Sequence, residues 1–223
     1  MISRQLIAEV IGTFALVFAG TGAIIANDVS GGAVTHPGIA LTFGLVVMAM
    51  IYAVGDISGA HLNPAVSCAF WIARRFPGKN VLPYIASQLL GAFAASVLLR
   101  SMFPDHTTLG STIPADGWWQ SFVFELFLTF ILMYVILCVA IGAKEKGIMA
   151  GAAIGATVGF EAMFAGPICG ASMNPARSLG PALVSGTIQG QWLYVVAPVL
   201  GAALAVLAWQ MTRNPEETPA QKT

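Results

Sequence analysis

Two stretches of the chain decide its fold: Ser58-Gly-Ala-His-Leu-Asn-Pro-Ala-Val66 and Gly170-Ala-Ser-Met-Asn-Pro-Ala-Arg-Ser178. In each, Asn-Pro opens an apolar segment of about eleven residues, 64–74 and 175–185. Asparagine is favoured just before a helix and proline at its first position. Each motif therefore predicts a helix that begins inside an apolar region. At about 16 Å, such a helix would cross half of a bilayer core.

The composition points to a membrane protein. Of 223 residues, 57% are hydrophobic and 9% are charged, and the mean hydropathy is +0.80. Soluble domains carry about a quarter charged residues, so bilayer is the solvent that fits this chain. A net charge of zero argues against a nucleic-acid partner. We find no disulfide framework, metal spacing, phosphate loop or nucleophile–base pair, and we predict neither a cofactor nor an enzyme.

Spanning helices need about 20 mostly apolar residues. We predict one membrane domain over residues 1–211 and a polar tail over 212–223. Six runs qualify as spans: 5–26, 38–55, 82–103, 119–142, 148–165 and 190–211.

The basic residues predict the orientation of the chain, because Lys and Arg concentrate in cytoplasmic loops. With the N-terminus inside, only Arg100 and Arg177 fall outside. The residues that fall inside are Arg4, Arg74, Arg75, Lys79, Lys144, Lys146, Arg213 and Lys222. We therefore expect a multi-pass protein of the plasma or inner membrane with both termini in the cytoplasm.

The chain also repeats itself. Glu9-Val-Ile-Gly-Thr13-Phe14 matches Glu125-Leu-Phe-Leu-Thr129-Phe130 at an offset of 116 residues, and the two Asn-Pro motifs match at an offset of 111. The halves, about 5–103 and 119–211, each hold three spans, so the second is inverted relative to the first. We predict an all-α membrane fold with six transmembrane helices and two re-entrant half-helices, and a solute path where the halves meet.

The two asparagines suggest the chemistry of that path. A capping asparagine accepts a hydrogen bond through its side-chain oxygen, which leaves its NH2 group to donate. Asn63 and Asn174 would then offer donors to a passing oxygen atom. Both half-helices point their positive ends at the centre, which repels cations and hydronium. This pattern favours a channel for neutral solutes over two ordinary turns.

The paired motifs resemble the signatures of the aquaporin, or major intrinsic protein, family, and the resemblance covers residues 5–211. It implies a homotetramer in the lipid bilayer, with passive flow of water and small uncharged solutes through each subunit. It assigns pore roles to the motif residues Asn63, Pro64, Ala65, Asn174, Pro175 and Ala176. It makes pore-lining carbonyls of Gly59, Ala60, His61, Gly170 and Ser172, and it gives Glu9 and Glu125 the task of supporting the loops.

The resemblance also places a selectivity filter at Phe43, Ala162, Ala171 and Arg177. Arg177 stands out independently, because a cation at a helix N-terminus opposes the helix dipole and is costly in a membrane. The two alanines suggest a wide filter that passes glycerol, urea or neutral metalloid acids as well as water. Three other positions resemble strict water channels and keep that alternative open: Ser178, Ala182 and Tyr194.

Several residues stay outside this scheme. Glu161 could satisfy the loop over 166–173 or touch the pore, His61 could position its loop or sense pH, and Cys169 could be a mercurial target or a buried thiol. A glycine face at Gly151, Gly155 and Gly159 predicts close helix packing. Two rival functions are an ion-coupled transporter, which needs carboxylates along the path, and a structural membrane protein with a closed pore.

Overall fold

A computed structural model describes residues 2–141 and 148–213, and over these residues the chain is helical, with no strand. Within this described part of the chain, six helices are long and apolar enough to cross a membrane. They confirm the six predicted spans to within four residues at each described end; position 142 lies outside the described residues. They are α1 (Ile2–Val29), α2 (Thr35–Ser58), α4 (Val81–Met102), α5 (Trp118–Ala140), α7 (Ala150–Cys169) and α9 (Leu193–Thr212).

Two short helices follow the Asn-Pro motifs, α3 (Pro64–Ile72) and α8 (Pro175–Ser185). Each begins at its proline, behind an extended asparagine whose side chain caps it. The predicted end of the first at residue 74 is wrong. Arg74 has φ 58°, a left-handed conformation that a helix cannot continue, and the chain then enters the 3-10 turn η1 (Gly78–Asn80).

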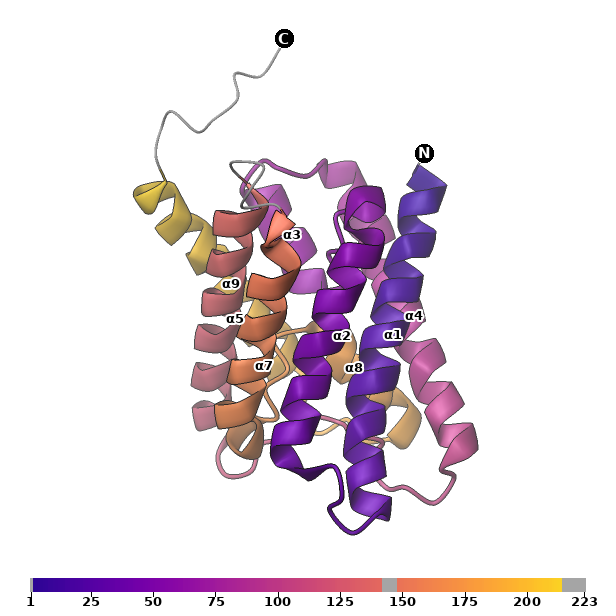
Figure 1. The fold of residues 1–223 in the computed structure, drawn as a ribbon. Coiled ribbons are helices and arrows are strands. Elements are labelled where there is room, and N and C mark those ends of the chain that lie inside the picture. Colours follow the sequence, from indigo (N-terminus) through magenta and orange to yellow (C-terminus); the bar gives the residue numbers. More distant parts are fainter. Residues whose placement is uncertain (1, 142–147, 214–223) are drawn as a thin grey trace.

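The packing follows one pattern twice. In the first half α1 packs against α2 and α4, and in the second half α5 packs against α7 and α9. Each half-helix lies against the other half, α3 on α9 and α8 on α4, while α2 and α7 join the halves directly. α1 begins at the top of Figure 1 and α5 at the bottom. This is the inverted repeat that the sequence predicts.

Glycines allow the helix backbones to touch at these contacts. A Cβ atom on Gly155 would lie 2.6 Å from the carbonyl oxygen of Gly44, and the reverse substitution would meet the same obstacle. The predicted packing face of α7 is therefore confirmed, and it lies on α2. Gly91 approaches the carbonyl of Val10 in the same way, as Gly201 approaches that of Leu126. These contacts leave the helices little freedom to shift.

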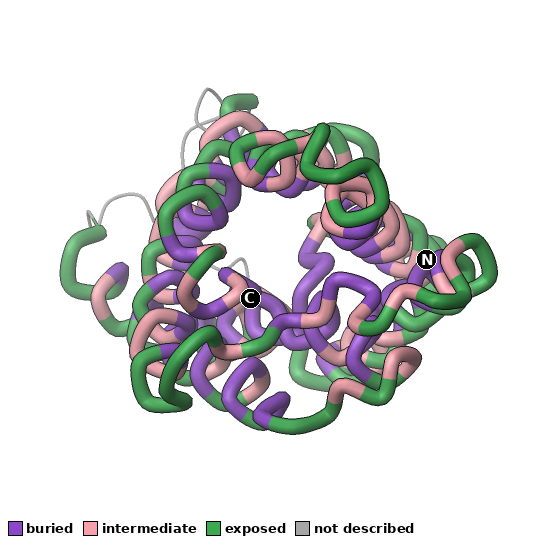
Figure 2. The backbone as a smooth tube through the Cα atoms, turned by 90° about the horizontal axis from the view of Figure 1, so that it is seen from below, coloured by how far each residue is buried: buried purple, intermediate pink, exposed green. Residues whose placement is uncertain are grey.

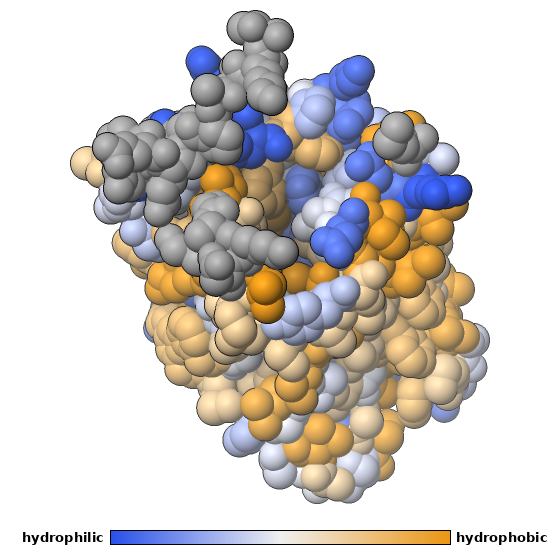
Figure 3. Space-filling model, turned by 45° about the horizontal axis from the view of Figure 1, so that its top comes forward, coloured by the Kyte–Doolittle hydropathy of each residue, from blue (hydrophilic) through white to orange (hydrophobic). Residues whose placement is uncertain are grey.

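The outer surface suits a bilayer. Buried residues turn inward around the axis of the bundle (Figure 2), whereas large side chains such as Leu82, Trp119 and Leu45 are exposed. Figure 3 shows an apolar belt on the sides and a hydrophilic rim around a hollow at one end. The beginning of α1 and the end of α9 lie at that same end (Figure 1). Three residues of the predicted charge pattern lie outside the described part: Lys144, Lys146 and Lys222.

Candidate functional site

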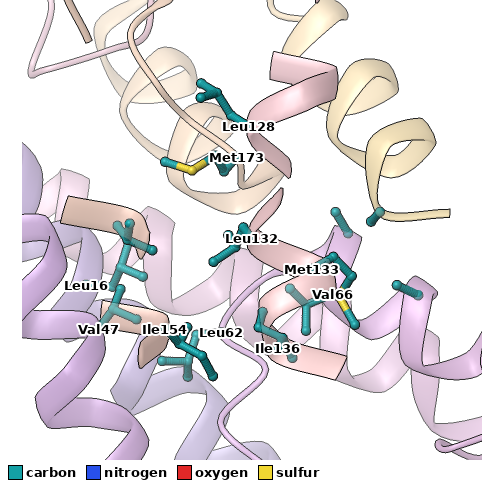
Figure 4. Packing of buried hydrophobic residues seen from close by; sticks show 14 of the residues in the cluster. Leu16, Val47, Leu62, Val66, Leu128, Leu132, Met133, Ile136, Ile154 and Met173 are labelled. Atoms are coloured by element: carbon teal, nitrogen blue, oxygen red, sulfur yellow. The ribbon is translucent and has the colours of Figure 1, made fainter. Parts of the chain in front are cut away.

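A cavity of about 740 Å³ runs between the two halves. Its wall is mostly apolar, and Figure 4 shows several of the aliphatic side chains that form it. Polar groups enter it from the segments 59–63 and 171–174, which lead into α3 and α8. The apolar lining includes Leu16, Val47, Val66, Leu132, Ile136, Ile154 and Val158.

The two segments bind each other through their asparagines. Asn63 Nδ2 donates to the carbonyl oxygen of Met173 at 2.7 Å, and Asn174 Nδ2 donates to that of Leu62 at 2.8 Å. Each Oδ1 meanwhile accepts from its own helix, from Ala65 N at 2.9 Å in the first half. The sequence predicts amide groups that are wholly free, and the structure uses one of the two N–H bonds of each amide for this cross-link. The other N–H bond stays available where both residues line the cavity.

An unusual backbone aims the carbonyls of these segments. Positive φ angles recur at matching positions in both, 46° at Ala60 and 51° at Leu62 against 39° at Ala171 and 54° at Met173. Such angles cost energy in residues other than glycine, so the surroundings must hold them. Of the predicted carbonyl residues, all but Gly170 line the cavity. Within residues 2–141 and 148–213, no protein donor reaches the carbonyls of Gly59, Ala60, His61, Gly170 and Ser172.

Glu9 holds the first segment. It is fully buried and accepts four hydrogen bonds: Oε1 from Ser58 Oγ at 2.7 Å and His61 N at 2.9 Å, Oε2 from Leu62 N at 2.7 Å and Gln88 Nε2 at 2.8 Å. The two backbone donors belong to the strained turn itself. A carboxylate on α1 thus fixes the conformation that turns the carbonyls toward the cavity.

Glu125 holds the second segment in the same manner, with fewer partners. It is fully buried, and its two oxygens accept from Ser172 N at 2.7 Å and Met173 N at 2.8 Å. A tyrosine on the last helix of each half repeats the symmetry. Tyr84 donates to the carbonyl of Ser58, as Tyr194 does to that of Cys169.

Arg177 and Phe43 both line the cavity. Arg177 is 3% exposed, and its Nη1 donates to the carbonyl of Gly110 at 2.8 Å. Its guanidinium carbon lies 4.8 Å from the centre of the Phe43 ring. Nε has no partner among the described residues. Because Nε is itself buried, the donors that can face a solute are those of Nη2, which no described acceptor binds.

The two alanines of the predicted filter are placed differently. Ala171 lines the cavity together with Phe43 and Arg177. Ala162 is 7% exposed and is not part of the cavity lining. It lies on α7 one turn beyond Val158, which does line the cavity. A methyl group at this position is too short to reach the path.

The sequence leaves two roles open for each of three further residues, His61, Cys169 and Glu161, and the structure shows what surrounds them. The ring of His61 packs against Phe70, Phe76 and Tyr84, with Nδ1 3.0 Å from Ser67 Oγ. Cys169 is fully buried and its thiol donates to the carbonyl of Ala165.

Glu161 is fully buried, and neither carboxyl oxygen has a partner among the described residues. It does not line the cavity. The expectation that it satisfies the 166–173 loop or touches the pore is therefore wrong.

Sequence reasoning missed the segment that braces Arg177. Residues 103–117 have no helical periodicity, yet Leu109 packs with Ile25 and Leu99, and this places Gly110 beside Arg177. Thr112 Oγ1 then donates to Ser178 Oγ at 2.8 Å. The only signal of this contact in the sequence is a leucine followed by a glycine, Leu109-Gly110, within the irregular connection.

Comparison with known proteins gives a consistent result. The family model "Major intrinsic protein" matches residues 1–209. "Aquaporin NIP1-1" of Oryza sativa subsp. japonica is 49% identical over 211 residues, or 94% of this chain and 74% of the relative. "Aquaporin NIP3-1" of Arabidopsis thaliana is 47% identical, over 96% of this chain and 69% of the relative. The X-ray structure of the aquaglyceroporin from Plasmodium falciparum superposes with a TM-score of 0.83 at 27% identity, over 97% of this chain and 99% of that one.

Proposed function

Because the chain belongs to the major intrinsic protein family, it is a passive membrane channel for water and small uncharged solutes, and we propose that its filter admits glycerol, urea and neutral metalloid acids. The observation that carries the proposal is the methyl group of Ala171, which lines the same cavity as Phe43 and Arg177. With Ala162 also small, two sides of the filter carry no bulky group. The structural neighbour is named an aquaglyceroporin, which favours the same reading.

A solute crossing the cavity would pass the two asparagines and the exposed carbonyls one after another. A water or hydroxyl oxygen accepts from the remaining amide N–H of Asn63 or Asn174, and its hydrogens find the carbonyls of the 59–61 and 170–172 turns. Replacing hydration in this way lets a neutral molecule cross at little cost. An ion would need more ligands than the apolar wall provides.

Exclusion of cations would rest on three positive elements. α3 and α8 direct their N-terminal ends to the middle of the path, and Arg177 adds a full charge at the filter. Protons carried as hydronium meet the same field. Asp56 is the one carboxylate among the described residues that line the cavity. It is exposed in the last turn of α2, 13 residues and therefore about 20 Å along that helix from Phe43, so its negative charge lies away from the filter.

A strictly water-selective channel is the alternative. The stack of Arg177 on Phe43 favours it, because two large groups share one side of the filter. An ion-coupled transporter is less well supported: Glu9 and Glu125 are used by the re-entrant segments, and Glu161 is away from the cavity.

We further propose a homotetramer in the cell membrane with both termini in the cytoplasm. The exposed apolar sides leave room for contacts between subunits. Five of the basic residues expected inside lie in the described part of the chain: Arg4, Arg74, Arg75, Lys79 and Arg213. The beginning of α1 and the end of α9 lie at the same end of the bundle (Figure 1). The charge bias of the sequence supports a cytoplasmic position for that face.

The test is stopped-flow light scattering on proteoliposomes, shocked first with an impermeant osmolyte and then with glycerol, urea or boric acid. The proposal expects fast shrinkage in the first case and fast re-swelling in the second. Water flux with every larger solute excluded would establish the strictly water-selective alternative.

A further inference from the structure

The aromatic side of the filter rests on a glycine of another helix. Gly20 lies on α1, one turn beyond the cavity-lining Leu16. A Cβ atom at Gly20 would lie 2.5 Å from both Cδ1 and Cζ of the Phe43 ring and closer still to Cε1. The edge of the ring therefore occupies the space that a side chain at position 20 would need.

Neither helix can easily retreat to make that space. α1 is held against α4 where Gly91 meets the carbonyl of Val10, and α2 is held against α7 where Gly44 meets that of Gly155. Both contacts are backbone against backbone. A side chain at position 20 must therefore move the ring of Phe43 and leave the helices in place.

The geometry sets the size of this movement. Carbon atoms in contact are about 3.5 Å apart, so the ring would have to shift by roughly 1–1.5 Å. It would leave the wall formed by α1 and enter the path that it shares with Arg177, whose guanidinium carbon is 4.8 Å from the ring centre. In a filter of this kind, a displacement of 1 Å is a large part of the difference in width between two small solutes.

The internal repeat shows which residues stand at the corresponding positions of the other half. At the offsets of 116 and 111 residues, Gly20 corresponds to Ile136 and Phe43 to Ile154. Both isoleucines line the cavity, and Figure 4 shows them on its wall. One half thus uses two side chains of medium size, and the other uses a large ring with no side chain behind it.

We propose that Gly20 is a specificity-determining position of this channel: by lacking a side chain it sets how far Phe43 is withdrawn from the path, and hence which solutes pass. Gly20 contacts no solute and acts through Phe43, so it is a positioning residue. The inference rests on the proposed function for the solute range, and on the structure for the contact itself.

The test compares Gly20→Ala with Gly22→Ala in proteoliposomes of matched protein content. Gly22 is a matched control on the same helix, because a Cβ atom there would lie 3.6 Å from Leu99, an ordinary contact. We expect Gly20→Ala to lower the ratio of glycerol to water permeability on the order of tenfold, as overpacking of a tight site predicts. Gly22→Ala should leave the ratio unchanged.

A second background separates this effect from misfolding. In Phe43→Ala the ring is absent, so adding Gly20→Ala should change neither flux. An equal loss of flux in both backgrounds, or an unchanged ratio in Gly20→Ala, would overturn the inference. If the wild type excludes glycerol, the wide-filter proposal fails by itself. The role of Gly20 is then decided by water flux, which should fall with the ring present and stay constant without it.

Discussion

Glu9 offers the sharpest test of how the re-entrant segments are held. Replacing Glu9 by Gln keeps the shape and exchanges one acceptor oxygen for an NH2 group. If that group replaces Oε1, Ser58 can turn to accept from it but His61 N loses its partner. If it replaces Oε2, Gln88 can turn its free Oε1 toward it but Leu62 N is left alone. In either case one buried backbone N–H is unsatisfied.

The magnitude follows from these contacts. A buried donor without a partner costs about 1–3 kcal/mol, and the remaining bonds weaken because they lose a charged acceptor. We expect Glu9→Gln to lower the free energy of unfolding by about 2–4 kcal/mol. Water flux should fall as well, because the strained turn loses a backbone anchor.

The assay is equilibrium unfolding in mixed detergent micelles, together with water flux in vesicles. Glu161→Gln is the matched control, since Glu161 is equally buried and has no described partner to lose. It should unfold within about 1 kcal/mol of the wild type. Equal losses in both variants would refute the reasoning, because burial and not the hydrogen bonds would then explain the cost.

Two further outcomes are expected. At the repeat offset of 111 residues, Glu161 corresponds to Met50, so Glu161→Met introduces the residue of the other half. This variant should raise the free energy of unfolding by about 1–3 kcal/mol, since it removes an unpaired buried carboxyl. A lower free energy of unfolding together with lost flux would show that Glu161 has a functional role. A variant that keeps Cys169 and replaces Cys68 and Cys138 by Ser should conduct water unchanged in mercuric chloride, because the Cys169 thiol is fully buried; inhibition would show that the thiol is reached from the path.

The larger features of this fold follow from simple sequence signals. Length and hydropathy predict the six spans, and Asn-Pro at the head of a short apolar run, found twice at matching positions of the repeat, predicts the two half-helices. The repeat adds the inversion, because an odd number of spans in each half reverses the second. The end of α3 was misjudged because Arg74 belongs to a left-handed turn that composition does not reveal.

The finer geometry of the site depends on contacts between distant residues. The cross-link from Asn63 to Met173 joins groups 110 positions apart, and no local pattern reports it. In the sequence, nothing distinguishes Gly20 from the other glycines of membrane helices. Only the structure shows that the Phe43 ring packs against it. The bracing of Arg177 by Gly110 comes from an irregular connection, where sequence periodicity is silent.

The central claim is that flux passes through the cavity between the two halves, and a tryptophan placed in its wall tests this directly. Val158 on α7 lines the cavity, while Phe160 on the same helix faces outward and is 49% exposed. The measurement is osmotic water permeability of proteoliposomes that carry Val158→Trp or Phe160→Trp at equal protein content. The account predicts that Val158→Trp falls to the level of protein-free vesicles and Phe160→Trp conducts like the wild type. Full water flux in folded Val158→Trp would contradict it.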